Sequence, residues 1–178
     1  MTFDSGPLAE ASVVPDGDDW TLIFIRDLRH PPGAVWAALT DPAELDQWAP
    51  FAADRDLGAT GDTTLTMIDG DTRMPLPATV RRADPPVLLE YSWGDDVLRW
   101  ELAPTDGGTR LTLRHTLAKP DQDAMIAAGW HLCVAVLARL LDGDPVGVIR
   151  GQNALEYGWE GLRDGYADMF KRDGLAGE

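Results

Sequence analysis

Three histidines and one cysteine are the side chains of this chain best suited to chemistry. His30, His115, His131 and Cys133 are scattered, and their spacing fits no zinc site, which needs several clustered ligands. The sequence also lacks G-x-S-x-G, P-loop, G-x-G-x-x-G and H-E-x-x-H motifs. We therefore expect no metal and no cofactor, and any chemistry would rest on single polar groups inside a pocket.

His115 is the titratable residue with the most informative position. It falls in an alternating stretch, residues 109–117, on the same side as Leu113 and Leu117. It could be a polar anchor or a general base inside a cavity, with Tyr91 as a second group. The ordinary interpretation is a core or rim histidine bonded to a neighbour, and a lone histidine names no reaction. The catalytic residues, if any, are unknown, and His115 and Tyr91 are only candidates.

Two further candidates fall on a predicted long helix. His131 follows Trp130 and could flank the same cavity, although a structural role is the more ordinary interpretation. Cys133 falls on the apolar stripe of that helix. A reactive thiol needs exposure and an electropositive neighbourhood, and the sequence indicates neither, so Cys133 is predicted to be a small core residue.

Tryptophan is unusually frequent, with seven Trp against four Phe and three Tyr. Strand alternation and helical spacing send most of these rings inward, where they would form either an ordinary core or the lining of an apolar pocket. The predicted cavity residues are Trp36, Trp48, Phe51, Met67, Tyr91, Trp93, Trp100, His115, Trp130, His131, Val134 and Leu137.

The elements that must position these residues begin with a run of strands. They are predicted at residues 20–28, 62–68, 72–82, 87–93, 97–102 and 109–117. Pro75 and Pro77 make the third of them an edge or bulged strand. The alternate positions of these strands are polar and form one face of the sheet, where Arg99 would pair with Glu90. Asp95-Asp96 is predicted to form a turn.

Four helices are predicted around this sheet. Two short ones follow the first strand, the second over residues 42–48 with Asp41 as its cap. A long amphipathic helix covers residues 121–141, capped by Asp121. A last helix, about residues 154–171, starts with Asn153 and Glu156 at capping-box spacing. It either packs on the convex side of the sheet or mediates self-association, and packing within the chain is preferred.

Length and net charge limit the classes of function that the chain could have. The chain has 178 residues and a net charge of −15, which argues against nucleic-acid and membrane-surface roles. Residues 1–19 carry five acids and no Lys or Arg, which predicts an acidic flexible arm rather than a signal peptide. Residues 20–145 would form the main domain and residues 146–178 a linker and an amphipathic helix. We expect a cytoplasmic protein, monomeric or homodimeric.

Three stretches together resemble one superfamily. They are RDLRHPPGAVWAALTDPAELDQWAP at 26–50, VLRWELAPTDGGTRLTLRHT at 97–116 and AAGWHLCVAVLARLLDGDP at 127–145. They resemble the SRPBCC (START-like, polyketide-cyclase-like) proteins, in the branch of homologues of the activator of the heat-shock-protein-90 ATPase. The resemblance implies an α+β helix-grip fold, in which about seven antiparallel strands curve around the long helix and leave a cavity.

The same resemblance implies three functions that stay open. The first is binding of a small hydrophobic or amphipathic molecule in the cavity. The second is a cyclase, lyase or hydrolase using His115 and Tyr91. The third is a partner-binding module like the chaperone activator, which rests on the family name alone. Fold does not decide among them.

Overall fold

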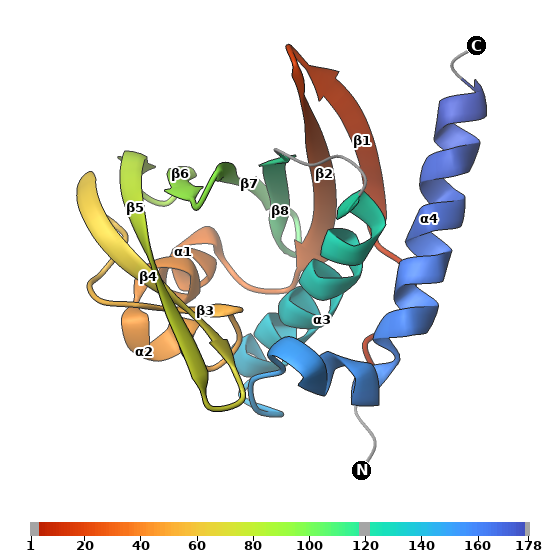
Figure 1. The fold of residues 1–178 in the computed structure, drawn as a ribbon. Coiled ribbons are helices and arrows are strands. Elements are labelled where there is room, and N and C mark those ends of the chain that lie inside the picture. The colour runs from red at the N-terminus through yellow and green to blue at the C-terminus, as the bar shows by residue number, and fades with distance from the viewer. Residues whose placement is uncertain (1–3, 118–121, 177–178) are drawn as a thin grey trace.

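A curved antiparallel sheet is the largest unit of the fold (Figure 1). The computed structural model describes residues 4–117 and 122–176. In this part of the chain eight strands follow the order β1-β2-β8-β7-β6-β5-β4-β3. Their bounds are β1 Glu10–Asp16, β2 Asp19–Leu28, β3 Phe51–Ala53, β4 Gly61–Asp69, β5 Thr72–Asp84, β6 Leu88–Trp93, β7 Asp96–Thr105 and β8 Gly108–Leu117.

The helices gather on the concave side of the sheet and at its β1 edge (Figure 1). Their bounds are α1 Pro32–Thr40, α2 Pro42–Leu45, α3 Asp123–Leu141, the 3-10 helix η2 Gly151–Tyr157 and α4 Trp159–Ala176. The Asp41 carboxylate accepts a hydrogen bond from the Ala43 amide at 2.8 Å and caps α2 as predicted. The α+β helix-grip fold predicted from the sequence is confirmed, with eight strands where about seven were expected.

Alternation along the strands produces one packed face and one wet face. Leu98, Trp100 and Leu113 are fully buried on the concave side. On the opposite face Arg99 lies 3.6 Å from Glu90, the cross-strand pair expected from their parity. The strand register therefore determines which side chains point towards α3.

Strand β5 is bulged, one of the two alternatives predicted for it, but the bulge is not at its prolines. Its register shifts between Val80 and Arg82. Pro75 and Pro77 lie in the half that pairs with β4 alone, where a missing amide donor disturbs no second ladder.

Helix α3 is the central element of the core. By length and mean hydropathy it could span a membrane, yet more than half of it is buried inside the protein. Every residue from Trp130 to Leu137 is buried, a wider face than the predicted single stripe, because α4 covers the side of α3 that the sheet leaves open. This burial is that of a core helix in a soluble protein. Its predicted cap, Asp121, lies outside the described residues.

Two predictions at the chain ends were wrong. Residues 1–19 are not simply a flexible arm, because Glu10–Asp16 pair with β2 as strand β1. The acidic residues and glycines around it hid this short strand, whose own apolar residues include Ala11, Val13 and Val14. The last helix does not start at an Asn153 cap: residues 151–157 form η2, and Gly158 adopts a left-handed conformation before α4 begins at Trp159.

Helix α4 packs within the chain, as preferred, but not on the convex side of the sheet. It lies beside α3 and against β1 (Figure 1). Tyr166 is completely buried, and its ring lies 6.3 Å from that of Phe24, whose side chain is on the concave face of β2. The concave face beside α3 would otherwise leave apolar surface exposed at its β1 edge, and α4 covers it.

Candidate ligand cavity

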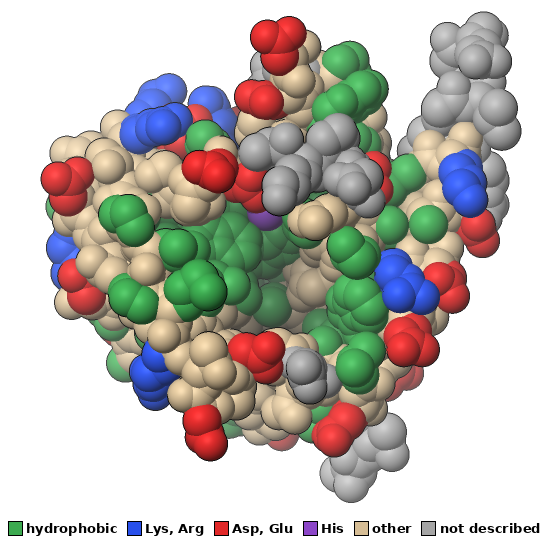
Figure 2. Space-filling view, in the orientation of Figure 1, with side chains coloured by type: hydrophobic (Ala, Val, Ile, Leu, Met, Phe, Trp, Pro, Cys, Tyr) green, Lys and Arg blue, Asp and Glu red, His purple; other side chains and the backbone are tan. Residues whose placement is uncertain are grey.

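A cavity of about 340 Å³ lies between the sheet, α3 and η2. Its size is at the lower end of the roughly 300–1,000 Å³ typical of small-molecule sites. Figure 2 shows the hollow, with hydrophobic side chains covering most of its walls. The lining residues are Pro50, Met67, Leu76, Trp93, Asp96, His115, Ile126, Gly129, Trp130, Leu132, Cys133, Ile149, Arg150, Gly151, Ala154 and Trp159.

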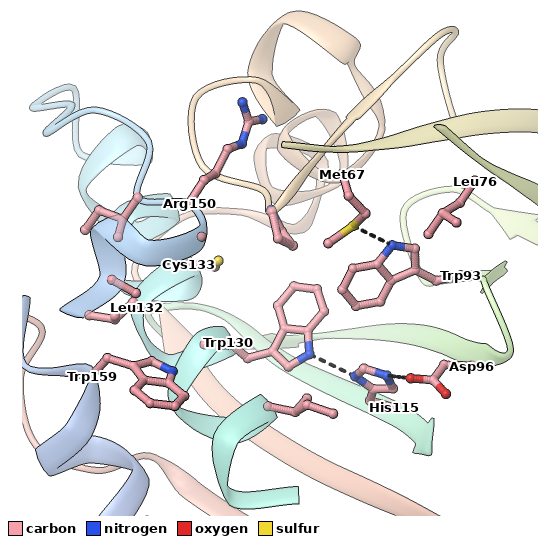
Figure 3. A pocket seen from close by; sticks show the side chains of 16 residues that line it. Met67, Leu76, Trp93, Asp96, His115, Trp130, Leu132, Cys133, Arg150 and Trp159 are labelled. Carbon is pink, nitrogen blue, oxygen red and sulfur yellow. Dashed lines mark hydrogen bonds and ion pairs between the residues drawn. The ribbon is translucent and has the colours of Figure 1, made fainter. Parts of the chain in front are cut away.

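One end of the cavity holds a chain of three hydrogen-bonded side chains (Figure 3). The Trp130 Nε1–H donates to Nδ1 of His115 at 3.0 Å. Because an indole nitrogen can only donate, Nδ1 must carry a lone pair, and the ring proton is on Nε2. Nε2 lies 2.7 Å from Oδ2 of Asp96, so His115 donates there. The His115 side chain is thereby held in one tautomer and one orientation.

Aromatic rings form the apolar wall next to this chain. The Trp93 ring lies 5.7 Å from that of Trp130 and 5.4 Å from that of Phe51. The Trp93 Nε1–H points at the Met67 sulfur, 3.2 Å away (Figure 3). With its nitrogen engaged, Trp93 presents ring carbon to the cavity, which suits an apolar or aromatic ligand.

The opposite end of the cavity is formed by Cys133 and by the segment that leads into η2. Burial raises the pKa of the Cys133 thiol to about 12, so the thiol is uncharged. The predicted small core residue is buried, but it also lines the cavity. The Arg150 guanidinium points away from the cavity centre (Figure 3). Its Nε donates to the Ala49 carbonyl at 2.8 Å, and its Nη2 lies 3.3 Å from Asp46. Arg150 therefore fixes the wall and leaves its methylene stem facing the cavity.

The sequence placed twelve residues in the cavity, and four of them line it: Met67, Trp93, His115 and Trp130. The other eight lie elsewhere. Trp36 is partly buried and packs against the core. The remaining seven are buried side chains of the core, namely Trp48, Phe51, Tyr91, Trp100, His131, Val134 and Leu137. Parity identified the concave face correctly, but it could not say where along that face side chains meet and where they leave space.

Tyr91 does not join His115. Its hydroxyl accepts the Trp100 Nε1–H at 3.0 Å inside the core, and burial raises its pKa above the ordinary range. It is not among the lining residues. Since both nitrogens of His115 are also engaged, the arrangement brings together no acid–base pair of the kind expected from these two residues.

His131 faces away from the cavity, towards α4 and the start of the chain. Its Nδ1 lies 2.7 Å from the Tyr166 hydroxyl, and its Nε2 lies 3.0 Å from the Ser5 carbonyl oxygen. The Tyr166 hydroxyl also accepts the Ala9 amide at 2.9 Å. Burial lowers the pKa of His131, so the ring is neutral and donates from Nε2. Its role in this structure is to tie three segments together.

Several lining residues were missed by the sequence reasoning. Asp96 was assigned to turn chemistry, yet it starts β7 opposite Trp93 and reaches His115. Trp159 was placed on the stripe of the last helix, Ala154 at its start, and Ile149 to Gly151 in a linker. Strand parity put Asp96 on the side of Leu98, a signal that was available. No local pattern signals the return of residues 149–159 to α3.

The described residues contain no group of three or more His, Cys, Asp or Glu side chains placed to hold a metal ion. Apart from the indole nitrogens, the polar side chains among the lining residues are Asp96, His115, Cys133 and Arg150.

Comparison with known families agrees with this architecture. A family model described as Activator of Hsp90 ATPase homolog 1-like protein matches residues 29–142, which is more than half of the chain. The chain belongs to this family. The family is part of the SRPBCC superfamily, as the resemblance indicated. Comparison with curated proteins finds no significant match.

Solved structures similar to this member of the family share its fold. A conserved protein of unknown function from Enterococcus faecalis has a TM-score of 0.69 at 15% identity, with 90% of each chain covered. CalU16 from Micromonospora echinospora has a TM-score of 0.67 at 20% identity, covering 91% of this chain and 98% of its own. The AHSA1 protein from Silicibacter pomeroyi has a TM-score of 0.59 at 22% identity, covering 68% of this chain and 97% of its own. These likenesses concern the fold.

Proposed function

We propose that this protein binds a small, largely apolar molecule in the cavity between the sheet and α3. The observation that carries the proposal is the wall itself: a space of about 340 Å³ faced by Trp93, Trp130 and Trp159 with one polar end at Asp96. A pocket of mostly apolar side chains with a few fixed polar groups is the usual form of a small-molecule site.

The polar end supports an orienting role. The Asp96–His115–Trp130 chain holds its donors and acceptors in fixed positions, so a ligand with one polar group would lie with that group at this end. Its apolar body would lie against the indoles. A flat, aromatic molecule satisfies this distribution best, because ring carbon meets ring carbon. The single buried cysteine and the soluble fold support a cytoplasmic site of action.

The test is a cavity-filling substitution. Gly129 lines the cavity on α3, and a Cβ built there meets no atom within 4 Å. Gly129→Leu would place a side chain in the ligand's space. Gly161→Leu is the matched control, because Gly161 is also a helical glycine with no atom within 4 Å of its Cβ, but it is exposed on α4.

The measurement is thermal unfolding with a panel of neutral aromatic compounds, including N-phenyl-1-naphthylamine. A compound present at about 100 times its Kd should stabilise the protein by about 2.7 kcal/mol. We expect this shift in the wild type and in Gly161→Leu, and its loss in Gly129→Leu. If no compound raises the Tm of the wild type, or if Gly129→Leu responds equally, the cavity is not a binding site for this class.

A further inference from the structure

One wall of the cavity comes from outside the part of the chain that the family model matches. Five of the sixteen lining residues follow residue 142, namely Ile149, Arg150, Gly151, Ala154 and Trp159. The matched region contains strands β3 to β8, α1, α2 and α3, and it supplies the other eleven lining residues. The remaining wall comes from residues 149–150, η2 and the first residue of α4. The residues that complete the cavity are thus added after the matched region.

The first end of this wall is fixed directly to the matched region. Arg150 donates to the backbone oxygens of Ala49 and Phe51, at 2.8 and 3.3 Å. Next to it, Gly151 passes so close to Asp69 at the end of β4 that a Cβ would collide with the carboxylate. Residues 150 and 151 are therefore held in place without help from α4.

The second end depends on how α4 is docked. Trp159 is the first residue of α4, and Arg163 lies over its indole, 5.2 Å from the ring centre. Tyr166 comes seven residues after Trp159, which is about two helical turns, or about 10.5 Å, along the same side of a rigid helix. Whatever fixes Tyr166 therefore fixes Trp159.

Tyr166 is fixed by a buried hydrogen-bond chain. Its hydroxyl accepts the Ala9 amide and donates to His131, which in turn donates to Ser5. This chain joins α4 to α3 and to the segment before β1. The side chains of Tyr166 and His131 are both buried. Removing either partner would therefore leave a buried polar atom of the other without a hydrogen bond.

We propose that Trp159 is a specificity-determining residue of the cavity, and that Tyr166 positions it through the hydrogen bond to His131. On the basis of the proposed function, the wall at α4 would then determine which sizes and shapes of ligand fit. Docking of α4 and closure of the cavity are then one event, so a ligand that contacts Trp159 also stabilises the docked helix.

Cys133 provides a readout that needs no ligand. It is the only cysteine of the chain, it lines the cavity, and it is 5% exposed. If α4 holds this wall in place, a small thiol reagent such as methyl methanethiosulfonate should reach the nearly buried Cys133 slowly, and faster when the wall moves away. The labelling rate of the native protein, followed by mass spectrometry, then reports the position of the wall.

Two variants and two matched controls form the experiment. Tyr166→Phe keeps the ring and removes the hydroxyl, and Trp159→Ala removes the wall residue. Tyr91→Phe deletes a buried hydroxyl that bonds Trp100 away from α4, and Trp20→Ala deletes an indole that is 38% exposed on β2. We expect labelling of Cys133 to be about fivefold faster or more in Tyr166→Phe, the change that loss of a buried hydrogen bond produces. Trp159→Ala should behave likewise, with both controls near the wild-type rate.

Two outcomes would overturn the inference. Wild-type labelling rates in Tyr166→Phe and Trp159→Ala would show that α4 does not close the cavity. An equal increase in all four variants would show general destabilisation instead. Binding of N-phenyl-1-naphthylamine separates the two proposals. If the wild type does not bind it, the proposal of ligand binding fails while the role of α4 can still be tested by labelling. If the wild type and Trp159→Ala bind two probes of different size with equal affinities, Trp159 does not determine specificity.

Discussion

The Trp130 indole donates its Nε1–H to Nδ1 of His115 over 3.0 Å, and this bond decides which nitrogen of the imidazole carries the proton. Trp130 comes from α3 and His115 from β8, so the bond also joins the helix to the middle of the sheet. A histidine that the sequence singled out for chemistry is thus held as a fixed part of the cavity wall.

Substituting Trp130 by Phe should leave Nδ1 of His115 without a donor. Phenylalanine keeps an aromatic ring but cannot donate, so Nδ1 of His115 loses its partner at a cost of about 1–3 kcal/mol. The ¹⁵N chemical shifts of His115 should show Nε2–H in both proteins, because Asp96 still accepts from Nε2, and the Nδ1 signal should move in Trp130→Phe as its hydrogen bond is lost. Trp100→Phe is the control, because Trp100 packs on Trp130 but donates to Tyr91. A wild-type His115 protonated on Nδ1 would contradict the assigned bond.

The stability of the protein should fall as the pH drops below neutrality, through His131. Burial, followed by the charge of Arg26, lowers the pKa of His131 in the folded protein, whereas in the unfolded chain it is near the usual 6.5. Above about 6.5 both states are neutral there and this contribution is complete. Below it the unfolded chain takes up a proton first, so stability is lost until the folded pKa is reached.

Urea unfolding between pH 7.5 and 5.5 measures this dependence. The midpoint should decline with falling pH in the wild type, and the decline should be smaller in His131→Gln, which has no proton to take up. Identical slopes in the two proteins would remove His131 as the cause.

Gly129→Ala should stabilise the protein by about 0.5–1 kcal/mol, because a helical glycine loses more backbone entropy than alanine on folding. The new methyl group meets nothing within 4 Å. Gly161→Ala, in exposed α4, should give a similar gain in Tm. A loss in Gly129→Ala beside a gain in Gly161→Ala would mean that the space next to Gly129 is already filled.

Gly151→Ala should destabilise the protein more than Gly147→Ala. Both glycines have positive φ, +57° and +90°, so alanine is strained at each. Only at residue 151 would the added methyl also strike Asp69, since nothing lies within 4 Å at residue 147. The difference between the two midpoints of chemical unfolding isolates this close approach, and equal losses would argue that the η2 segment does not rest on β4.

The sequence predicted the strands well because their alternation is regular where one face is wet. His115, Leu113 and Leu117 fall on one side in both the prediction and the structure. The same reasoning failed at β1, where an acidic composition obscured a strand that pairs fully with β2. Pairing partners stabilise such a strand, and they are not encoded in its own residues.

The cavity was less accessible to prediction than the fold. Alternation indicates that Tyr91 and Trp93 point inward, and both rings pack against Phe51 of β3. It does not indicate that Trp93 borders the cavity whereas Tyr91 lies in the core. Trp159 was invisible as a cavity residue because its position depends on a helix docked by Tyr166, seven residues away. Contacts of this kind are set by the whole fold.

The pairing of β2 with β8 has a consequence for folding during synthesis. These strands are joined in register from Trp20–Leu117 to Leu28–Thr109, although about ninety residues separate them in the chain. The sheet can close only after residue 117 has left the ribosome, and α3 becomes available later still. Until then the β1–β2 hairpin, with Leu22 and Phe24, has no core to enter, so pairing at such sequence separation should make folding slow and dependent on protection of this hairpin in the nascent chain.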